Sequence, residues 1–130
     1  MPLTGYTVVY GGSFNPPHMG HQMACLYVLE ALAAESVWLV PSRVHPFGKP
    51  LAPVEARVEM CRRMARAFGE RVKVSLIEAQ GEVSGRTYDT LDRLRRDHPQ
   101  RRFALAIGAD LVAETAQWYR WRDIEAMVRV

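Results

Sequence analysis

The 130-residue chain has few cysteines, no long apolar run and no internal repeat. Cys25 and Cys61 lie far apart and belong to no Cys-x-x-Cys or Cys/His cluster, so the sequence predicts buried free thiols rather than a disulfide or a nucleophile. No stretch approaches the roughly 18–20 apolar residues of a membrane-spanning helix, and the first residues lack a secretory signal. These absences predict one cytoplasmic domain, residues 1–130, with no membrane partner.

Lysine is also scarce, although basic residues outnumber acidic ones. The 17 basic and 14 acidic residues give a net charge of +3, and Lys49 and Lys73 are the only lysines. The arginines are spread over several predicted helices without interleaved aromatic residues, which argues against a nucleic-acid interface. Genomic base composition explains such an excess of arginine, and a small anionic ligand does so too, because guanidinium groups bind phosphate well.

Strand-like and helix-like segments alternate along the chain. Runs of β-branched and aromatic residues predict strands at 6–10, 36–40, 72–77 and 102–107. Apolar residues spaced three or four apart predict helices at about 19–35, 54–68, 88–94 and 118–127. Repeated βα units predict an α/β fold, a Rossmann-like doubly wound parallel sheet with helices on both faces. Residues 128–130 resemble the start of another strand, so we expect the C-terminal part of the domain to be missing.

Three predicted strands end in unusual loops, at residues 11–21, 41–53 and 108–110. The carboxyl ends of parallel strands lie at one edge of a sheet, where ligands bind at the point at which strand order reverses. The three loops are therefore expected to converge on one crevice.

The first of these loops has the most informative sequence, Gly11-Gly-Ser-Phe-Asn-Pro-Pro-His-Met-Gly-His21. Its glycines allow the backbone to approach a ligand closely. His18 and His21 are three residues apart at a predicted helix N-terminus, where free N–H groups and the helix dipole favour phosphate. Two imidazoles there fit charge stabilisation during phosphoryl transfer. The alternatives are histidines that only cap the turn, and a metal pair that would need His45 as third ligand.

This loop resembles the (His/Thr)-x-Gly-His signature of a nucleotidyltransferase superfamily, and within it the bacterial nicotinate-nucleotide adenylyltransferases. The resemblance covers nearly the whole chain. Its further motifs are Val40-Pro-Ser42, Arg57, Thr87-x-x-Thr90-Leu91, Ile107-Gly-Ala-Asp-Leu111 and Trp118-x-x-Trp121. It implies transfer of an adenylyl group from ATP to nicotinate mononucleotide, giving deamido-NAD and pyrophosphate in NAD biosynthesis. It also implies Mg²⁺ held mainly by the ATP phosphates, with no metal site built from protein side chains.

The resemblance also implies roles for individual residues. His18 and His21 would bind phosphate and stabilise the transition state. The residues implied to contact ATP are Gly12, Ser13, Phe14, His18, His21, Lys49, Gly108 and Asp110. Those implied to contact the pyridine nucleotide are Ser42, Arg86, Thr87 and Trp118, the last by stacking on the ring. A core position for Trp118 is the alternative.

The chain departs from the family pattern at three places. His45 is shifted relative to the usual Pro-Pro-His-Lys, Arg86 stands where the family often has Tyr, and a later Ser/Thr-x-x-Arg motif is absent. We therefore expect weak ATP binding from this chain alone. Nicotinamide mononucleotide and phosphopantetheine stay open as acceptors, as does a nucleotide-binding module without catalysis. A homo-oligomer is compatible with the sequence.

Overall fold

The computed structural model describes residues 2–43, 51–84, 86–107 and 115–128. Within these residues, four strands form one sheet in the order β3-β2-β1-β4. The strands are β1 (Tyr6–Gly12), β2 (Ser36–Pro41), β3 (Val72–Val74) and β4 (Arg102–Ala106). Every neighbouring pair is parallel. Strand order reverses between β1 and β4, and the ligand crevice of a doubly wound sheet lies at that point.

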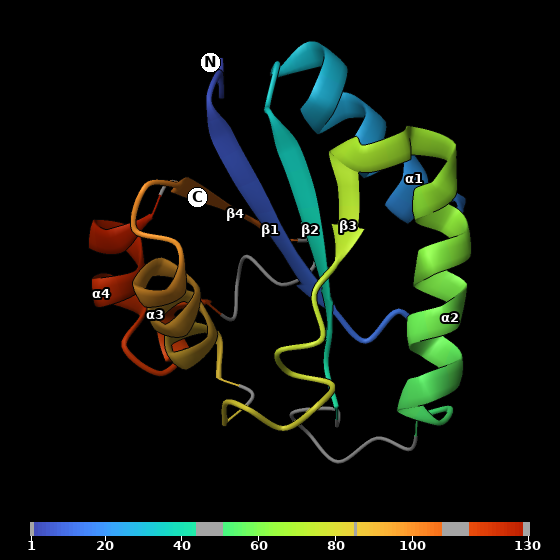
Figure 1. Cartoon of the computed structure of the whole chain (residues 1–130). Helices are drawn as coiled ribbons and strands as arrows, with labels where there is room; N and C mark the ends of the chain where they lie inside the picture. Colours follow the sequence, from blue (N-terminus) through green and yellow to red (C-terminus); the bar gives the residue numbers. More distant parts are fainter. Residues whose placement is uncertain (1, 44–50, 85, 108–114, 129–130) are drawn as a thin grey trace.

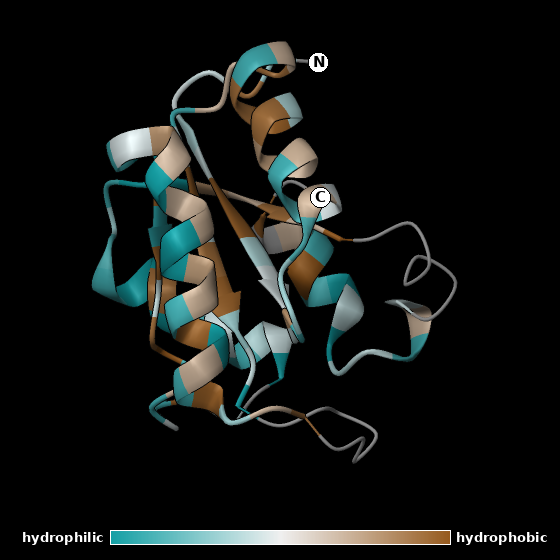
Figure 2. Cartoon of the chain, turned by 90° about the vertical axis from the view of Figure 1, so that its right-hand side faces the viewer, coloured by the Kyte–Doolittle hydropathy of each residue, from teal (hydrophilic) through white to brown (hydrophobic). Residues whose placement is uncertain are grey.

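Helices cover both faces of the sheet (Figure 1). One face carries α1 (Met19–Leu26), which continues into the π-helical turn η1 (Tyr27–Ala31), and α2 (Val54–Ala65), which continues into the 3₁₀ turn η2 (Arg66–Arg71). The other face carries α3 (Thr87–Asp97) and α4 (Trp121–Met127). In Figure 2, α1 and α2 lie side by side in front of the largely hydrophobic strands. The predicted doubly wound α/β fold is confirmed.

The sheet separates two hydrophobic cores, because neighbouring residues of a strand point to opposite faces. Val8 faces α1 and α2, whereas Val9 faces α3 and α4. Cys25 and Cys61 are buried in the first core as free thiols, as predicted, and burial raises the pKa of each to about 11. Both thiols are therefore protonated at neutral pH.

Several element boundaries differ from the predicted ones. The helix predicted at 19–35 ends at Ala31, and the strand predicted at 72–77 ends at Val74. The helix predicted at 118–127 begins only at Trp121, because Arg120 has a φ of 54°. A residue in the left-handed region cannot lie inside a right-handed helix. Of the strand expected at 128–130, only Val128 is described, and it is no strand residue.

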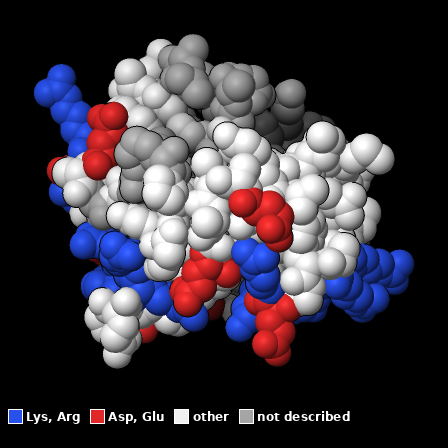
Figure 3. All heavy atoms as spheres, turned by 90° about the horizontal axis from the view of Figure 1, so that it is seen from above, with Lys and Arg blue, Asp and Glu red and all other residues white. Residues whose placement is uncertain are grey.

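Charged side chains of both signs are interspersed on the face shown in Figure 3, which is the end of the sheet where the strands begin. Seven ion pairs join described residues, and all are at least partly exposed. Within the described residues, no helix is long and apolar enough to cross a membrane.

Candidate functional site

The first loop (residues 13–18) leads from β1 to α1 and ends in a cap built from two histidines. His18 is the N-cap residue, and its Nδ1 accepts the backbone N–H of Gly20 over 3.0 Å. The Nδ1 of His21 accepts the backbone N–H of His18 over 2.9 Å. This reciprocal arrangement is a capping box in which imidazoles replace the usual hydroxyl and carboxylate groups.

The cap determines where each imidazole carries its proton. An Nδ1 atom that accepts a hydrogen bond has no hydrogen of its own, so a neutral ring carries its proton on Nε2. Burial and the neighbouring His18 both lower the pKa of His21. His21 is therefore neutral at neutral pH and presents an Nε2–H donor beside the N-terminus of α1.

Gly20 is required by this geometry. A Cβ atom at position 20 would lie 2.8 Å from Cε1 and 3.0 Å from Nδ1 of His18. The first of these distances is shorter than van der Waals contact allows, so any other residue would displace the ring. The glycine between the two histidines is thus explained by the close approach of the His18 ring to the first turn of α1.

The histidine rings are held by aromatic neighbours. The rings of His18 and His21 stack with their centroids 3.9 Å apart. The centroid of the Phe14 ring lies 4.8 Å from that of His21. Phe14 is buried, and its backbone has a φ of 48°. The left-handed backbone at Phe14 turns the chain sharply while the side chain anchors the turn in the core.

The first loop is joined to the segment that follows β2. Ser42 donates its backbone N–H to the Gly12 carbonyl oxygen over 2.9 Å and its hydroxyl to the same oxygen over 3.2 Å. The Asn15 side-chain oxygen accepts the backbone N–H of Ala52 over 3.0 Å. Arg57 donates to carbonyl oxygens of both segments. The structure thus brings together two of the three loops expected to converge.

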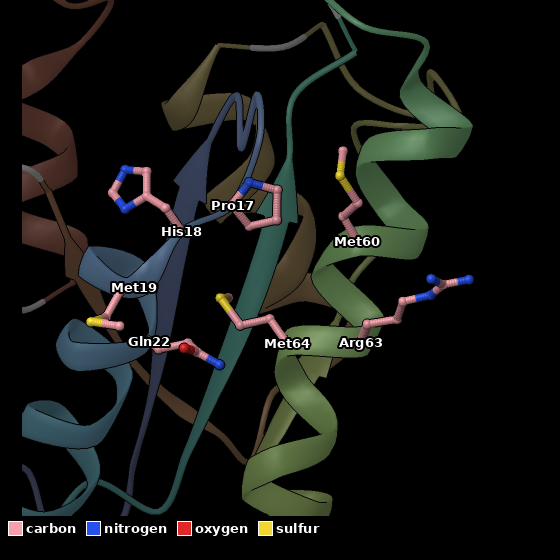
Figure 4. A pocket seen from close by; sticks show the side chains of 7 residues that line it. All are labelled: Pro17, His18, Met19, Gln22, Met60, Arg63 and Met64. Carbon is pink, nitrogen blue, oxygen red and sulfur yellow. The ribbon is translucent and has the colours of Figure 1, made fainter.

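A groove of about 250 Å³ lies between α1 and α2, with His18 at its edge (Figure 4). Met60 and Met64 point into it from α2, whereas the His18 imidazole is turned away from α2. Arg63 is the one cation among its lining residues, which are Pro17, His18, Met19, Gln22, Met60, Arg63 and Met64. The groove is mainly apolar, so it offers a phosphate less than the histidine cap does.

Arg86, Thr87 and Trp118 lie on the other face of the sheet. Arg86 is the N-cap residue of α3, and its guanidinium carbon is 4.5 Å from the centre of the Tyr119 ring. Trp118 is half-buried, packs against the core of this face and makes an edge-to-face contact with Trp121. The structure therefore brings the segments around Arg86 and Trp118 together, and α3 begins at the same end of the sheet as the first loop (Figure 1).

A carboxyl group absent from the sequence-based prediction lies between β3 and α3. Glu78 accepts a hydrogen bond from the Thr90 hydroxyl over 2.7 Å. Burial raises the pKa of Glu78 to about 7, and the Thr90 hydrogen bond opposes this rise only in part. A single Glu in a loop carries no sequence signal for such burial, because it depends on the contact with α3. Four residues of the prediction, Lys49, Gly108, Asp110 and His45, lie outside the described residues.

The chain is similar to known proteins in both sequence and fold. The cytidylyltransferase-like family model matches residues 9–130. The chain belongs to this family. It is 50% identical over 123 residues to a protein of Anaeromyxobacter sp. (strain K) named "Probable nicotinate-nucleotide adenylyltransferase", with 92% of this chain and 65% of that protein covered. A protein of the same name from Myxococcus xanthus (strain DK1622) is 44% identical over 120 residues, with 92% and 63% covered.

A solved structure shows the same fold. The nicotinic acid mononucleotide adenylyltransferase of Plasmodium falciparum, complexed with NaAD, superposes with a TM-score of 0.81 at 22% identity, covering 92% of this chain and 59% of that chain. At this identity the likeness concerns the fold alone. The chain spans slightly less than two thirds of the length of the two bacterial relatives.

Proposed function

We propose that the protein transfers an adenylyl group from ATP to nicotinate mononucleotide, forming deamido-NAD and pyrophosphate. The observation that carries this proposal is the pair of imidazoles at the N-terminus of α1, each with Nδ1 bonded to backbone. Their Nε2–H groups are left as donors beside a helix N-terminus, a combination that stabilises phosphate oxygens. The names of the bacterial relatives support the choice of substrates.

In the proposed reaction, a phosphate oxygen of the mononucleotide attacks the α-phosphorus of ATP. A new P–O bond forms, and the bond from the α-phosphorus to the bridging oxygen breaks, with the electron pair leaving on pyrophosphate. Negative charge gathers on the oxygens around the α-phosphorus, where N–H donors such as those of His18 and His21 stabilise it without transferring a proton. ATP would enter as its Mg²⁺ complex, so the ion is part of the substrate.

The pyridine ring would lie on the α3 side. Arg86 is exposed, and Trp118 offers part of an aromatic face. A cation beside the ring favours the carboxylate of nicotinate over the neutral amide of nicotinamide, because only the former is charged. This charge supports nicotinate mononucleotide over nicotinamide mononucleotide and over phosphopantetheine, which has no such ring.

Pyrophosphate release with different pairs of substrates tests the proposal. The purified protein is incubated with ATP or CTP and with nicotinate mononucleotide, nicotinamide mononucleotide or phosphopantetheine as acceptor, and the products are separated by chromatography. We expect the fastest release with ATP and nicotinate mononucleotide. Faster release with another acceptor would reassign the substrate. ATP binding without release from any pair would favour a binding module that lacks catalysis.

A further inference from the structure

Arg57 is a buried arginine whose hydrogen-bond partners, among the described residues, are backbone oxygens. Its side chain is 1% exposed. Nε donates to Ala52 O over 2.9 Å, Nη1 to Ser13 O over 2.8 Å and to Ser42 O over 2.6 Å, and Nη2 to Arg43 O over 3.1 Å. None of the described Asp or Glu side chains forms an ion pair with it. A buried charge without a paired carboxylate is costly, so a role for this arginine is expected.

The carbonyl groups that face Arg57 set the direction of the neighbouring N–H groups. In a trans peptide, C=O and N–H point in opposite directions. Ser13 O accepts from Arg57, so the N–H of Phe14 points away from Arg57. Gly12 O accepts from Ser42, so the N–H of Ser13 points away from Ser42. The two successive N–H groups thus point away from Arg57 and from the segment that follows β2.

The opposite side of β1 is the side of β4, because the sheet order is β3-β2-β1-β4. That is where strand order reverses and where the crevice of a doubly wound sheet lies. Successive N–H groups that converge on one side form an anion-binding nest. The left-handed φ of 48° at Phe14 is typical of such a nest.

We propose that Arg57 is a positioning residue that holds the Ser13 and Ser42 carbonyl groups so that the N–H groups of Ser13 and Phe14 face a phosphate. The guanidinium does not touch the nucleotide. It acts through the backbone of the first loop, and its charge, which the four carbonyl dipoles offset in part, adds a positive field behind the loop. This inference rests on the proposed function in that the phosphate belongs to a nucleotide substrate.

The planar guanidinium is suited to this role. Four hydrogen bonds to three chain segments need donors on all three nitrogen atoms of the group. A lysine keeps the charge, but its single ammonium group carries three donors and cannot span these oxygens. Arg57→Lys therefore separates the charge from the hydrogen-bond geometry.

The first measurement needs no variant. Inorganic pyrophosphate is titrated into the wild-type protein while the backbone amides are followed by ¹H–¹⁵N NMR. We expect the Ser13 and Phe14 resonances to be among those that shift most. Shifts confined to other amides would overturn the proposal, whatever the variants do.

The second measurement compares Arg57→Lys with Arg62→Lys, an exposed position on the same helix. We expect Arg57→Lys to weaken pyrophosphate binding by about tenfold or more, since at least one charge-assisted hydrogen bond is lost, and to shift the Ser13 and Phe14 resonances before any ligand is added. Arg62→Lys should change neither. A folded Arg57→Lys protein with wild-type affinity and unchanged resonances would refute the positioning role. If Arg57→Lys does not fold, Ser42→Ala, which removes the hydroxyl bond to Gly12 O, is expected to change the same two resonances, and no change would count against the proposal.

The outcomes separate this inference from the proposed function. A protein that responds to pyrophosphate at Ser13 and Phe14 but releases none from ATP and nicotinate mononucleotide would retain the positioning role and lose the proposed reaction. A protein that catalyses the reaction equally well with Lys at position 57 would keep the reaction and lose the positioning role.

Discussion

The two sides of the candidate site are built in different ways. On the side of α1, the first loop is held by backbone hydrogen bonds, by a buried arginine and by stacked rings. On the side of α3, Arg86 lies over the exposed ring of Tyr119 at 4.5 Å, and Arg120 lies over the half-buried ring of Tyr88 at 4.1 Å. The first arrangement fixes donors in place, whereas the second consists of surface contacts that solvent weakens.

This difference matches the demands of the two halves of the proposed reaction. Stabilising a transferring phosphoryl group requires donors that do not reorganise during the reaction, which favours backbone N–H groups and locked imidazoles. Recognising a pyridine ring requires only a flat surface and a charge, which exposed side chains supply. Substitutions on the α1 side should therefore change turnover, and those on the α3 side should change apparent affinity for one substrate.

His21→Ala is expected to have the largest effect. Loss of one preorganised donor should lower kcat by on the order of 10²–10³. The free energy of unfolding should fall by about 1–2 kcal/mol, because the hydrogen bond to His18 and the ring contacts with His18 and Phe14 are lost. Pyrophosphate release and thermal unfolding measure both effects. His98→Ala, which removes a half-buried histidine beside Trp38, is the control and should leave kcat unchanged. Wild-type turnover in His21→Ala would show that the locked imidazoles on the α1 side do not determine turnover.

Glu78→Gln tests whether the α3 side contains a buried group that responds to pH. The folded pKa of about 7 lies above the ordinary value of 4.5, so the folded state binds more protons between these pH values. Stability should therefore fall as pH rises from about 4.5 to 7, and level off above, by roughly 3 kcal/mol in total. Glu78→Gln keeps an oxygen that accepts from Thr90 and should remove this slope.

Denaturant unfolding between pH 4 and pH 8 measures the effect of Glu78→Gln. Glu82→Gln serves as the matched control, since Glu82 is exposed and pairs with Arg93 at the surface. The control should retain the slope. An unchanged slope in Glu78→Gln would show that the pH dependence arises elsewhere.

Much of the fold could be predicted from the sequence because its signals are local. The β-branched runs gave the strands, and the alternation with apolar-striped helices gave the parallel sheet. The elements whose boundaries differed depend on contacts between distant segments or on backbone conformation. Nothing near Arg120 in the sequence indicates its left-handed φ, which delays the start of α4 to Trp121.

The candidate site was predictable to a similar degree. The spacing of His18 and His21 was sufficient to place both at the N-terminus of α1, as the structure confirms. The sequence left open whether they cap the helix or bind phosphate, and the structure shows that they cap it through Nδ1 while Nε2 remains a donor. The carbonyl partners of Arg57 are up to 44 residues away in sequence, and no local pattern reveals them.

Trp118→Ala should have a smaller effect, confined to one substrate. Loss of an aromatic partner is worth about 0.5–1.5 kcal/mol beyond buried area, so KM for the pyridine nucleotide should rise roughly 2- to 10-fold while KM for ATP stays constant. Trp118→Phe retains a flat ring and should restore most of the affinity. Equal changes in both KM values would assign Trp118 to packing alone, in keeping with its contact with Trp121.

Arg86→Ala is expected to have the smallest effect, because the guanidinium is exposed and its interaction with a carboxylate is screened by solvent. We expect KM for nicotinate mononucleotide to rise about 2- to 5-fold, which corresponds to less than about 1 kcal/mol, and KM for nicotinamide mononucleotide to stay the same. Because salt screens exposed charges, the difference between wild type and variant should shrink between 0.05 and 0.5 M NaCl. Arg95→Ala, at an exposed position further along α3, is the control. A salt-independent loss of affinity for both nucleotides would show that Arg86 acts by holding Tyr119 in place rather than by its charge, and the α3 side would then be as preorganised as the α1 side.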